Sequence, residues 1–170
     1  DSLQDMLDLT EKISARGYET SINLMMSSHY STADWKHVID VVNKSKFKPT
    51  FLYFADSFGN LKPNDILSIV NKLKKLNNIK IGFHSHNQLQ LAFANTLKAI
   101  ELDVDIVDAT ITGMGKGPGN LPTELLLGHF DHDLKYVNNF IEDEMKELMD
   151  IYEWGYLHKY FICGLYNASP

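Results

Sequence analysis

The sequence has one cysteine, no cluster of basic residues and no long apolar run, and each absence excludes a class of protein. Because Cys163 has no second cysteine to pair with, no disulfide can form within the chain, and this usage is typical of the reducing cytoplasm. The net charge of −6 and the scattered Lys and Arg residues argue against nucleic acid as a partner. No run of about 18 apolar residues occurs and no secretory signal opens the chain, so we expect no membrane segment.

The length and composition indicate one ordinary globular domain. The 170 residues are 44% hydrophobic, which is enough to bury a core. Asp1 stands where an initiator Met is expected, and a helical pattern begins directly after it. We therefore expect the natural protein to contain further sequence upstream.

Helical and strand patterns alternate along the first 111 residues. Apolar spacings of three and four predict helices over residues 2–16, 33–45, 63–76 and 88–102. Apolar and β-branched stretches predict strands over residues 18–26, 50–56, 78–84 and 104–111, the first of them a buried strand. This alternation calls for parallel β/α units, so the predicted fold class is α/β.

Two architectures fit this alternation: an open, doubly wound sheet, or part of a (β/α)₈ barrel, which typically needs about 250 residues. Both place function at the carboxyl ends of the strands. In this chain those ends are residues 25–29, 55–60, 84–87 and 110–120.

The sharpest candidate is the pair His84 and His86 at the end of the third strand. Residues two apart on a strand face the same side, so two imidazoles can bind one cation from one wall. Gly82 precedes them on that face and is expected to leave the site uncrowded. The alternative is that either His merely forms a hydrogen bond in a polar loop.

Two further strand ends supply candidate substrate-binding residues. Asp56 and Ser57 follow the second strand, which would place a carboxylate on the same rim; alternatively, Asp56 caps the following turn. Gly115 and Gly117 belong to a loop with four glycines in residues 113–119, and such a loop lets the backbone approach a ligand closely. The loop matches neither standard phosphate-binding motif, and a flexible turn is the alternative.

Four motifs in this order resemble the 4-hydroxy-2-oxovalerate aldolases. They are residues 23–29 (Asn-Leu-Met-Met-Ser-Ser-His), 55–59 (Ala-Asp-Ser-Phe-Gly), 82–87 (Gly-Phe-His-Ser-His-Asn) and 113–120 (Gly-Met-Gly-Lys-Gly-Pro-Gly-Asn). This family belongs to the metal-dependent barrel lyases and synthases, a group that includes hydroxymethylglutaryl-CoA lyase and isopropylmalate synthase. The resemblance covers about residues 1–128.

The resemblance implies that His84 and His86 bind a divalent metal and that Asn120 lies in or near its coordination sphere. The family's cation is Mn²⁺ or Mg²⁺, and ligand softness favours Mn²⁺ at a site with two histidines. The implied reaction is that of a class II aldolase, in which a small 2-oxo acid, a 4-hydroxy-2-oxo acid, is cleaved to pyruvate and an aldehyde. The metal serves there as a Lewis acid.

The chain departs from the family because it has no counterpart of the Arg and the metal-binding Asp of the first barrel strand. Aligned by order, its strands correspond to strands five to eight of a barrel. Residues 1–130 are then the C-terminal half of the barrel, and 131–170 a helical C-terminal extension. Since proteins avoid exposing unpaired sheet edges, we expect a missing N-terminal half or an oligomer. The isolated chain should be inactive or nearly so.

The extension carries two features of its own. Apolar residues at helical spacing predict a helix over residues 133–152 that packs on the barrel or on a neighbour. Gly155, Tyr156 and Tyr160 are similar to a Gly-Tyr-x-x-x-Tyr stretch that follows the barrel in the aldolases. This likeness implies that Tyr160 reaches the substrate as a catalytic residue, and the alternative is a packing tyrosine.

Two other functions stay open at this point. A flavodoxin-like nucleotide-binding domain would bind an anion or a flavin at a Gly-rich loop. A non-catalytic half barrel that serves as an interaction module would show no metal binding that depends on His84. For the aldolase, an aldehyde dehydrogenase that accepts the product is a candidate partner.

Overall fold

The structure, a computed structural model, describes residues 2–169, so the expectation made at Asp1 lies outside the described residues. Four strands form one sheet: β1 (Ser21–Leu24), β2 (Phe51–Asp56), β3 (Lys80–Ser85) and β4 (Ile106–Val107). The helices that alternate with them are α1 (Ser2–Ser14), α2 (Thr32–Lys44), α3 (Pro63–Leu73) and α4 (Ala92–Glu101). The predicted α/β class and the predicted order of elements are confirmed.

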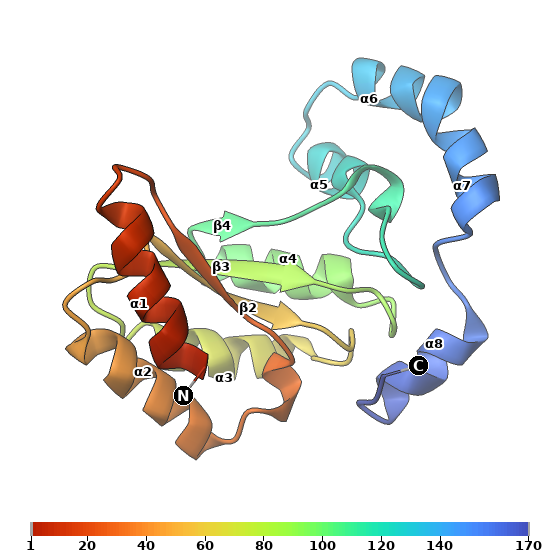
Figure 1. The fold of residues 1–170 in the computed structure, drawn as a ribbon. Coiled ribbons are helices and arrows are strands. Elements are labelled where there is room, and N and C mark those ends of the chain that lie inside the picture. Colours follow the sequence, from red (N-terminus) through yellow and green to blue (C-terminus); the bar gives the residue numbers. More distant parts are fainter. Residues whose placement is uncertain (1, 170) are drawn as a thin grey trace.

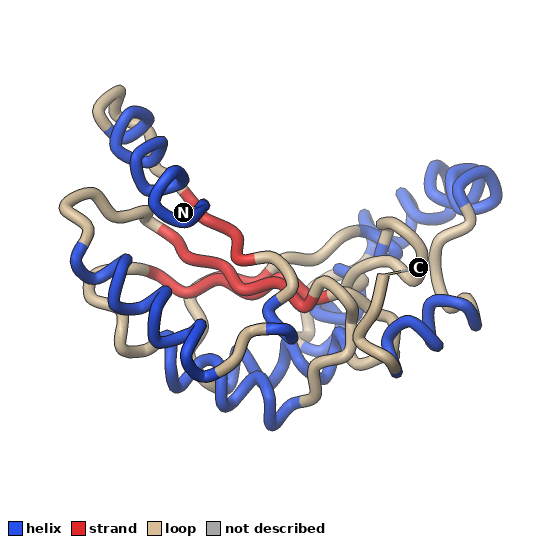
Figure 2. Tube along the Cα trace, turned by 60° about the horizontal axis from the view of Figure 1, so that its bottom comes forward, coloured by secondary structure: helices blue, strands red, loops and turns tan. Residues whose placement is uncertain are grey.

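The order of the strands distinguishes between the two architectures. The strands pair in the order in which they occur in the chain, and every pairing is parallel. A doubly wound sheet reverses its strand order and carries helices on both faces. Here the helices between the strands lie on one side of the sheet, and the other side is uncovered (Figures 1 and 2). This arrangement is typical of barrel-like β/α units.

One hydrophobic core fills the space between the sheet and the helices. Alternate strand residues point into it, namely Ile22, Leu24, Leu52, Phe54, Ile81 and Phe83. Asn23 and Tyr53 alternate with these core residues and lie on the uncovered face, where Asn23 is exposed and Tyr53 half-buried. The first strand, which was predicted to be buried, is therefore buried on one face only, because within residues 2–169 no second layer covers the other face.

Helix α4 begins at Ala92, four residues later than the pattern predicted. Residues 86–91 form a turn instead, in which the Leu89 N–H donates to the Gly59 carbonyl at 3.1 Å. The side-chain oxygen of Asn87 accepts from the Ala92 N–H at 3.2 Å, and Gln90 has a φ of 58°. The segment after the histidine pair is thus tied to the loop that follows β2.

Strand β4 has two residues, whereas the pattern predicted a strand over 104–111. Beyond Asp108 the chain leaves β3. The Thr110 N–H donates to the Leu121 carbonyl at 3.0 Å, and the Thr110 carbonyl accepts from the Thr123 N–H at 2.9 Å. The Gly-rich segment is therefore a closed loop whose two ends meet beside the sheet.

The rest of the chain lies beyond the carboxyl ends of the strands (Figure 1). It forms α5 (Thr123–His129), α6 (Lys135–Phe140), the π-helical segment η3 (Ile141–Met145), α7 (Lys146–Tyr152) and α8 (His158–Leu165). The segments α6, η3 and α7 follow one another without a break, where one helix was predicted. Within residues 133–152, Met145 alone is buried, so this helix packs little on the sheet. No helix within residues 2–169 has the length and apolar character needed to cross a membrane.

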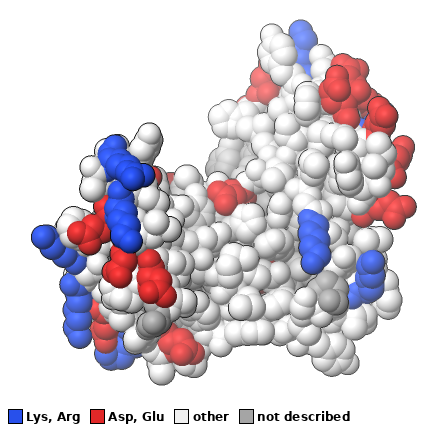
Figure 3. Space-filling view, in the orientation of Figure 1, with Lys and Arg blue, Asp and Glu red and all other residues white. Residues whose placement is uncertain are grey.

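Negative charge is concentrated on this C-terminal part. Figure 3 shows acidic side chains gathered over the end of the molecule where α6 and α7 lie, and few charged side chains in the middle of the same face. The exposed acidic residues of η3 and α7 are Glu142, Asp143, Glu144, Glu147 and Asp150.

Candidate metal site

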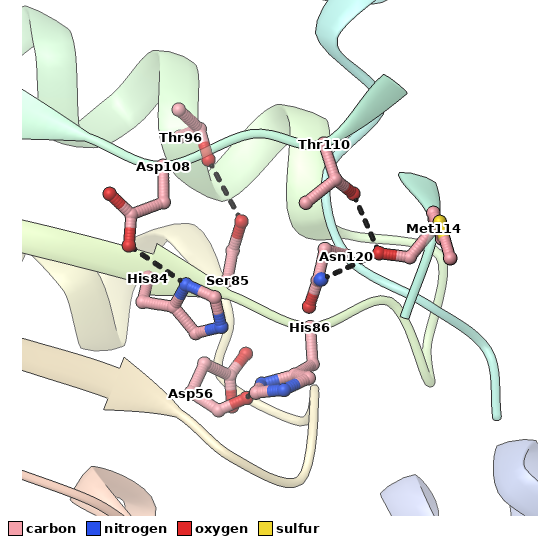
Figure 4. Close-up of polar contacts among 9 residues, drawn as sticks. All are labelled: Asp56, His84, Ser85, His86, Thr96, Asp108, Thr110, Met114 and Asn120. Carbon is pink, nitrogen blue, oxygen red and sulfur yellow. Dashed lines mark hydrogen bonds and ion pairs between the residues drawn. The ribbon is translucent and has the colours of Figure 1, made fainter. Parts of the chain in front are cut away.

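The two histidines lie together at the carboxyl end of β3. His84 is within the strand and His86 follows it directly. Their ring centroids are 4.8 Å apart, and the rings meet edge to face. Figure 4 shows both side chains on the same side of the strand, as the spacing of two residues predicted.

Each histidine uses its Nδ1 atom for a hydrogen bond within the protein. The Nδ1 atom of His86 lies 3.0 Å from the main-chain carbonyl oxygen of Asp56, and that of His84 lies 3.0 Å from the Asp108 carboxylate (Figure 4). A carbonyl or carboxylate oxygen accepts, so Nδ1–H is the donor in both pairs. Both Nε2 atoms are then left with a lone pair that can bind a cation.

The environment of His86 favours its neutral form. Burial lowers the pKa of His86, and the neighbouring charge of His84 lowers it further, while the hydrogen bond to the Asp56 carbonyl opposes both effects. Metal ions bind neutral imidazole, so a depressed pKa keeps this ring available as a ligand near neutral pH.

Asn120 brings an amide oxygen to the same place. It forms a β-bridge with His86, and its Nδ2 donates to the Met114 carbonyl at 3.0 Å. This bond fixes the amide so that Oδ1 is directed away from Met114. In Figure 4 the Oδ1 atom lies on the side of the amide that faces the histidine rings.

These three atoms could supply part of the coordination shell of a cation. Within residues 2–169, no three side chains of the His, Cys, Asp or Glu type gather closely enough to hold a metal ion. The donor set of the chain is two Nε2 atoms and one amide oxygen, which suits a divalent cation that also takes oxygen ligands. The residues therefore fit such an ion, which would need further ligands to complete its coordination shell.

Asp56 does not present its carboxylate to this rim. The side chain is completely buried and accepts from the backbone N–H groups of Asn60 and Leu61, with Oδ1 at 3.0 and 3.3 Å. Burial raises the pKa of Asp56 to about 7, although these N–H bonds act in the opposite direction. The expectation of a rim carboxylate at Asp56 is wrong, because its side chain follows the helix-facing side of β2. Its carbonyl oxygen, which holds His86, is the atom at the site.

The Ser57 hydroxyl forms a hydrogen bond with a neighbouring loop. Its hydroxyl accepts a hydrogen bond from the Met26 N–H at 2.8 Å, which joins the loop after β2 to the loop after β1. The structure thus gives Ser57 a loop-joining contact, and its role as a substrate contact stays a prediction.

The two predicted glycines of the Gly-rich loop make room for other side chains. A Cβ on Gly115 would come within 2.6 Å of the Asn120 amide, and one on Gly117 within 2.6 Å of the Tyr160 ring. Gly117 also has a φ of 63°, which side-chain-bearing residues rarely adopt. These glycines line a cavity of about 550 Å³, with Trp154 and Tyr160 on its other wall. Substrate binding by this loop stays a prediction.

Tyr160 lies over the Gly-rich loop and not among the hydrogen bonds of the histidine pair. Its ring packs on Gly117, and the Lys159 ammonium group is 5.0 Å from the ring centroid. Within residues 2–169 its hydroxyl has no hydrogen-bond partner. A packing role is what these contacts show, and the catalytic role stays a prediction.

Two residues at the site were not singled out from the sequence. Asp108 binds His84, whereas Asp105, three residues earlier, accepts from the Ile81 N–H at 2.8 Å. Tyr53 lies over Gly82, so that this glycine does not leave open space as expected. Because side chains alternate along β2, Tyr53 lies on the other face of the sheet from the core residue Phe54. Only the register between the strands brings Tyr53 to the site.

Comparison with known proteins places this chain among lyases and aldolases. Residues 1–151 match the HMGL-like family. A 4-hydroxy-2-oxovalerate aldolase of Geobacillus genomosp. 3 is 37% identical over 111 residues, which are 65% of this chain and 32% of that protein. An oxaloacetate decarboxylase of Mycobacterium tuberculosis is 32% identical over 126 residues, 72% of this chain and 36% of the relative.

A solved structure extends the likeness to nearly the whole chain. The N-terminal domain of a putative aldolase from Bacteroides vulgatus superposes with a TM-score of 0.84 at 30% identity, covering 98% of this chain and 57% of that one. The chain spans about a third of the length of the two curated relatives. Since the family match runs over residues 1–151, this chain belongs to the HMGL-like family of lyases and aldolases.

Proposed function

We propose that this chain supplies the metal-binding wall of a class II aldolase that cleaves a 4-hydroxy-2-oxo acid to pyruvate and an aldehyde. The observation that carries the proposal is the pair of histidines whose Nδ1 atoms are both engaged, so that both Nε2 atoms are free at one strand end. The likeness to 4-hydroxy-2-oxovalerate aldolases supports the choice of substrate class.

Each residue of the chain has a defined part in this proposal. His84 and His86 hold a divalent ion through Nε2, and Asn120 contributes Oδ1 within or beside the coordination sphere. Mn²⁺ or Mg²⁺, when bound, supplies a Lewis acid that polarises the 2-oxo acid. The Gly-rich loop, through Gly115 and Gly117, forms a wall against the substrate, and Tyr160 closes that wall from the other side.

The remainder of the active site comes from outside these residues. We infer that the four strands are strands five to eight of a (β/α)₈ barrel, with 1–130 as the barrel half and 131–170 as the extension. The uncovered sheet face and the two edge strands β1 and β4 support this inference, since closure of a barrel removes both. An N-terminal half or a second subunit would complete the barrel, and the chain alone should be inactive or nearly so. A cytoplasmic location and an aldehyde dehydrogenase partner belong to the same proposal.

Decarboxylation of oxaloacetate is a second candidate reaction, because a relative that aligns with 72% of this chain is an oxaloacetate decarboxylase. Both reactions break the bond between C3 and C4 of a 2-oxo acid and leave pyruvate. Oxaloacetate carries a carboxylate at C4, whereas the aldolase substrate carries a hydroxyl. Assays of the complete protein with the two substrates side by side distinguish these activities.

The first experiment is Mn²⁺ titration of this chain and of a His84→Ala/His86→Ala variant, by calorimetry with elemental analysis. We expect one site per chain that the variant loses. Equal affinity in both proteins would contradict the proposal and favour a non-catalytic half barrel as an interaction module. Flavin added to the same samples tests the flavodoxin-like alternative, which the family match does not support. In the complete protein, His86→Ala should abolish cleavage.

A further inference from the structure

Three neighbouring strands meet in one polar cluster on the uncovered face of the sheet. Residues pair across the sheet as Tyr53 with Gly82 and Ala55 with His84. Gly82 in turn pairs with Ile106 on β4, so that Asp108, two residues further on, lies beside His84. The cluster thus joins Tyr53 of β2, His84 of β3 and the residue that follows β4.

Tyr53 occupies the space over β3 that Gly82 leaves free. A Cβ on Gly82 would lie 2.6 Å from three atoms of the Tyr53 ring, so any other residue here would force the ring away. From this position the tyrosine interacts with Asp108. Burial raises the pKa of Tyr53, and the charge of Asp108 and a hydrogen bond to its carboxylate raise it further. Because a carboxylate accepts hydrogen bonds, the Tyr53 hydroxyl is the donor in this contact.

The two histidines are held in different ways. His86 is fixed by the backbone, since its Nδ1–H donates to the Asp56 carbonyl. His84 depends on a side chain, because the partner of its Nδ1–H is the Asp108 carboxylate at 3.0 Å. A mutation can remove the Asp108 carboxylate without disturbing the main chain, whereas it cannot remove the Asp56 carbonyl.

Stability alone is a weak reason for this arrangement. The Asp108 side chain is 41% exposed, and ion pairs at exposed positions contribute little to folding. In metal sites, by contrast, a carboxylate behind a ligating histidine fixes its tautomer and orientation, and loss of such a partner typically weakens metal binding about 10- to 100-fold.

We propose that Asp108, supported by the Tyr53 hydroxyl, is a positioning residue that holds His84 in the Nδ1–H tautomer and so directs its Nε2 lone pair at the cation. This inference rests on the proposed metal site. Gly82 is part of the same arrangement, because its lack of a side chain leaves the space that the Tyr53 ring occupies beside Asp108.

The test combines one measurement without metal and one with it. Long-range ¹H–¹⁵N NMR of the metal-free chain at about pH 8, above the ordinary pKa of histidine, reports the tautomer of each ring. A His84→Ala variant identifies the His84 signals. We expect the Nδ1–H form of His84 in the wild type and a shift towards the Nε2–H form in Asp108→Ala.

Mn²⁺ affinity gives the second readout. We expect a loss of about 10- to 100-fold in Asp108→Ala and a smaller loss in Tyr53→Phe, which removes only the hydroxyl. Asp103→Asn is the matched control, because it removes one negative charge from a side chain that is 92% exposed and pairs with Lys74. Its Mn²⁺ affinity should equal that of the wild type.

The outcomes separate this inference from the proposed function. An unchanged His84 tautomer together with unchanged Mn²⁺ affinity in Asp108→Ala overturns the positioning role. Another outcome is that the wild type binds no Mn²⁺ while the His84 tautomer still shifts in Asp108→Ala. That result contradicts the proposed metal site and supports the role of Asp108 in fixing the His84 tautomer. A shift in both readouts supports the full proposal.

Discussion

The sheet with its helices and the C-terminal helices differ in what holds them in place. All members of the hydrophobic core lie between Leu3 and Ala99, whereas the buried apolar residues of the C-terminal part are Met145 and Trp154. Residues 1–130 contain 14 acidic and 13 basic side chains, and residues 131–170 contain 8 and 3. The first region is stabilised by its own core, while the second is attached through a few specific contacts and carries most of the net charge.

Those contacts follow the carboxyl ends of the strands. The Trp154 indole N–H donates to the Thr112 carbonyl at 3.0 Å, and Gly164 of α8 packs closely on Gln88. Further on, the Ser28 hydroxyl donates to the Asn167 side chain at 2.7 Å. The C-terminal part therefore touches the loops after β4, β3 and β1. The sheet therefore positions the two histidines, and the C-terminal part packs on the loops at its carboxyl end.

The largest effect should come from the core of the first region. Phe54 is fully buried and stacks on Phe83 with ring centroids 4.7 Å apart. We expect Phe54→Ala to lower the free energy of unfolding by about 3–5 kcal/mol, because it leaves a cavity. Tyr136→Ala in the C-terminal part, where the side chain is 79% exposed, should change it by less than about 0.5 kcal/mol. Urea unfolding of both variants checks the contrast, and similar losses would contradict it.

The buried carboxyl group of Asp56 in the first region should make the free energy of unfolding depend on pH. Burial raises the pKa of Asp56 to about 7 in the folded chain, from its ordinary value of 3.8. The folded state therefore binds a proton at Asp56 more tightly than the unfolded state does. The contribution of protonated Asp56 to the free energy of unfolding is fully present below about pH 4 and is lost as the pH rises through 7. The loss amounts to at most about 5 kcal/mol at 1.4 kcal/mol per pKa unit.

An Asp56→Asn variant tests this effect, because the amide oxygen can still accept from the Asn60 and Leu61 N–H groups. Unfolding by urea between pH 4 and 8 should show a smaller decrease in stability for the variant than for the wild type. Asp150→Asn, which removes an exposed acid of the C-terminal part, controls for the loss of one charge. Equal pH profiles for wild type and Asp56→Asn would show that burial of this carboxyl is not destabilising.

The smallest effect should come from the attachment of the C-terminal part. Trp154→Phe keeps an aromatic ring but removes the hydrogen bond to Thr112, which we expect to cost about 1 kcal/mol. Amide hydrogen exchange should become faster in residues 155–169 and stay unchanged in β2 and β3. Faster exchange in the sheet as well would show that the two regions unfold together and are not held independently.

Much of the fold was predictable because it depends on local patterns. Spacings of three and four residues identified the four helices, and apolar stretches identified the strands between them. The shorter β4 and the later start of α4 were not predictable, since they result from hydrogen bonds of Thr110 with Leu121 and of Leu89 with Gly59. These partners are far apart in the sequence, so periodicity carries no sign of them.

The sequence by itself determined the alternation of strands and helices, the rim where function would lie and the common face of His84 and His86. The alternation follows from helical spacings and apolar stretches, the rim from the parallel β/α architecture, and the common face of the histidines from the two-residue period of a strand. Only the tertiary structure decided that Asp56 turns its carboxyl into the protein, that Asp108 meets His84 and that Tyr53 covers Gly82. Those relations depend on the register between strands, which is set by packing of the whole sheet on its helices and is not encoded in any one segment.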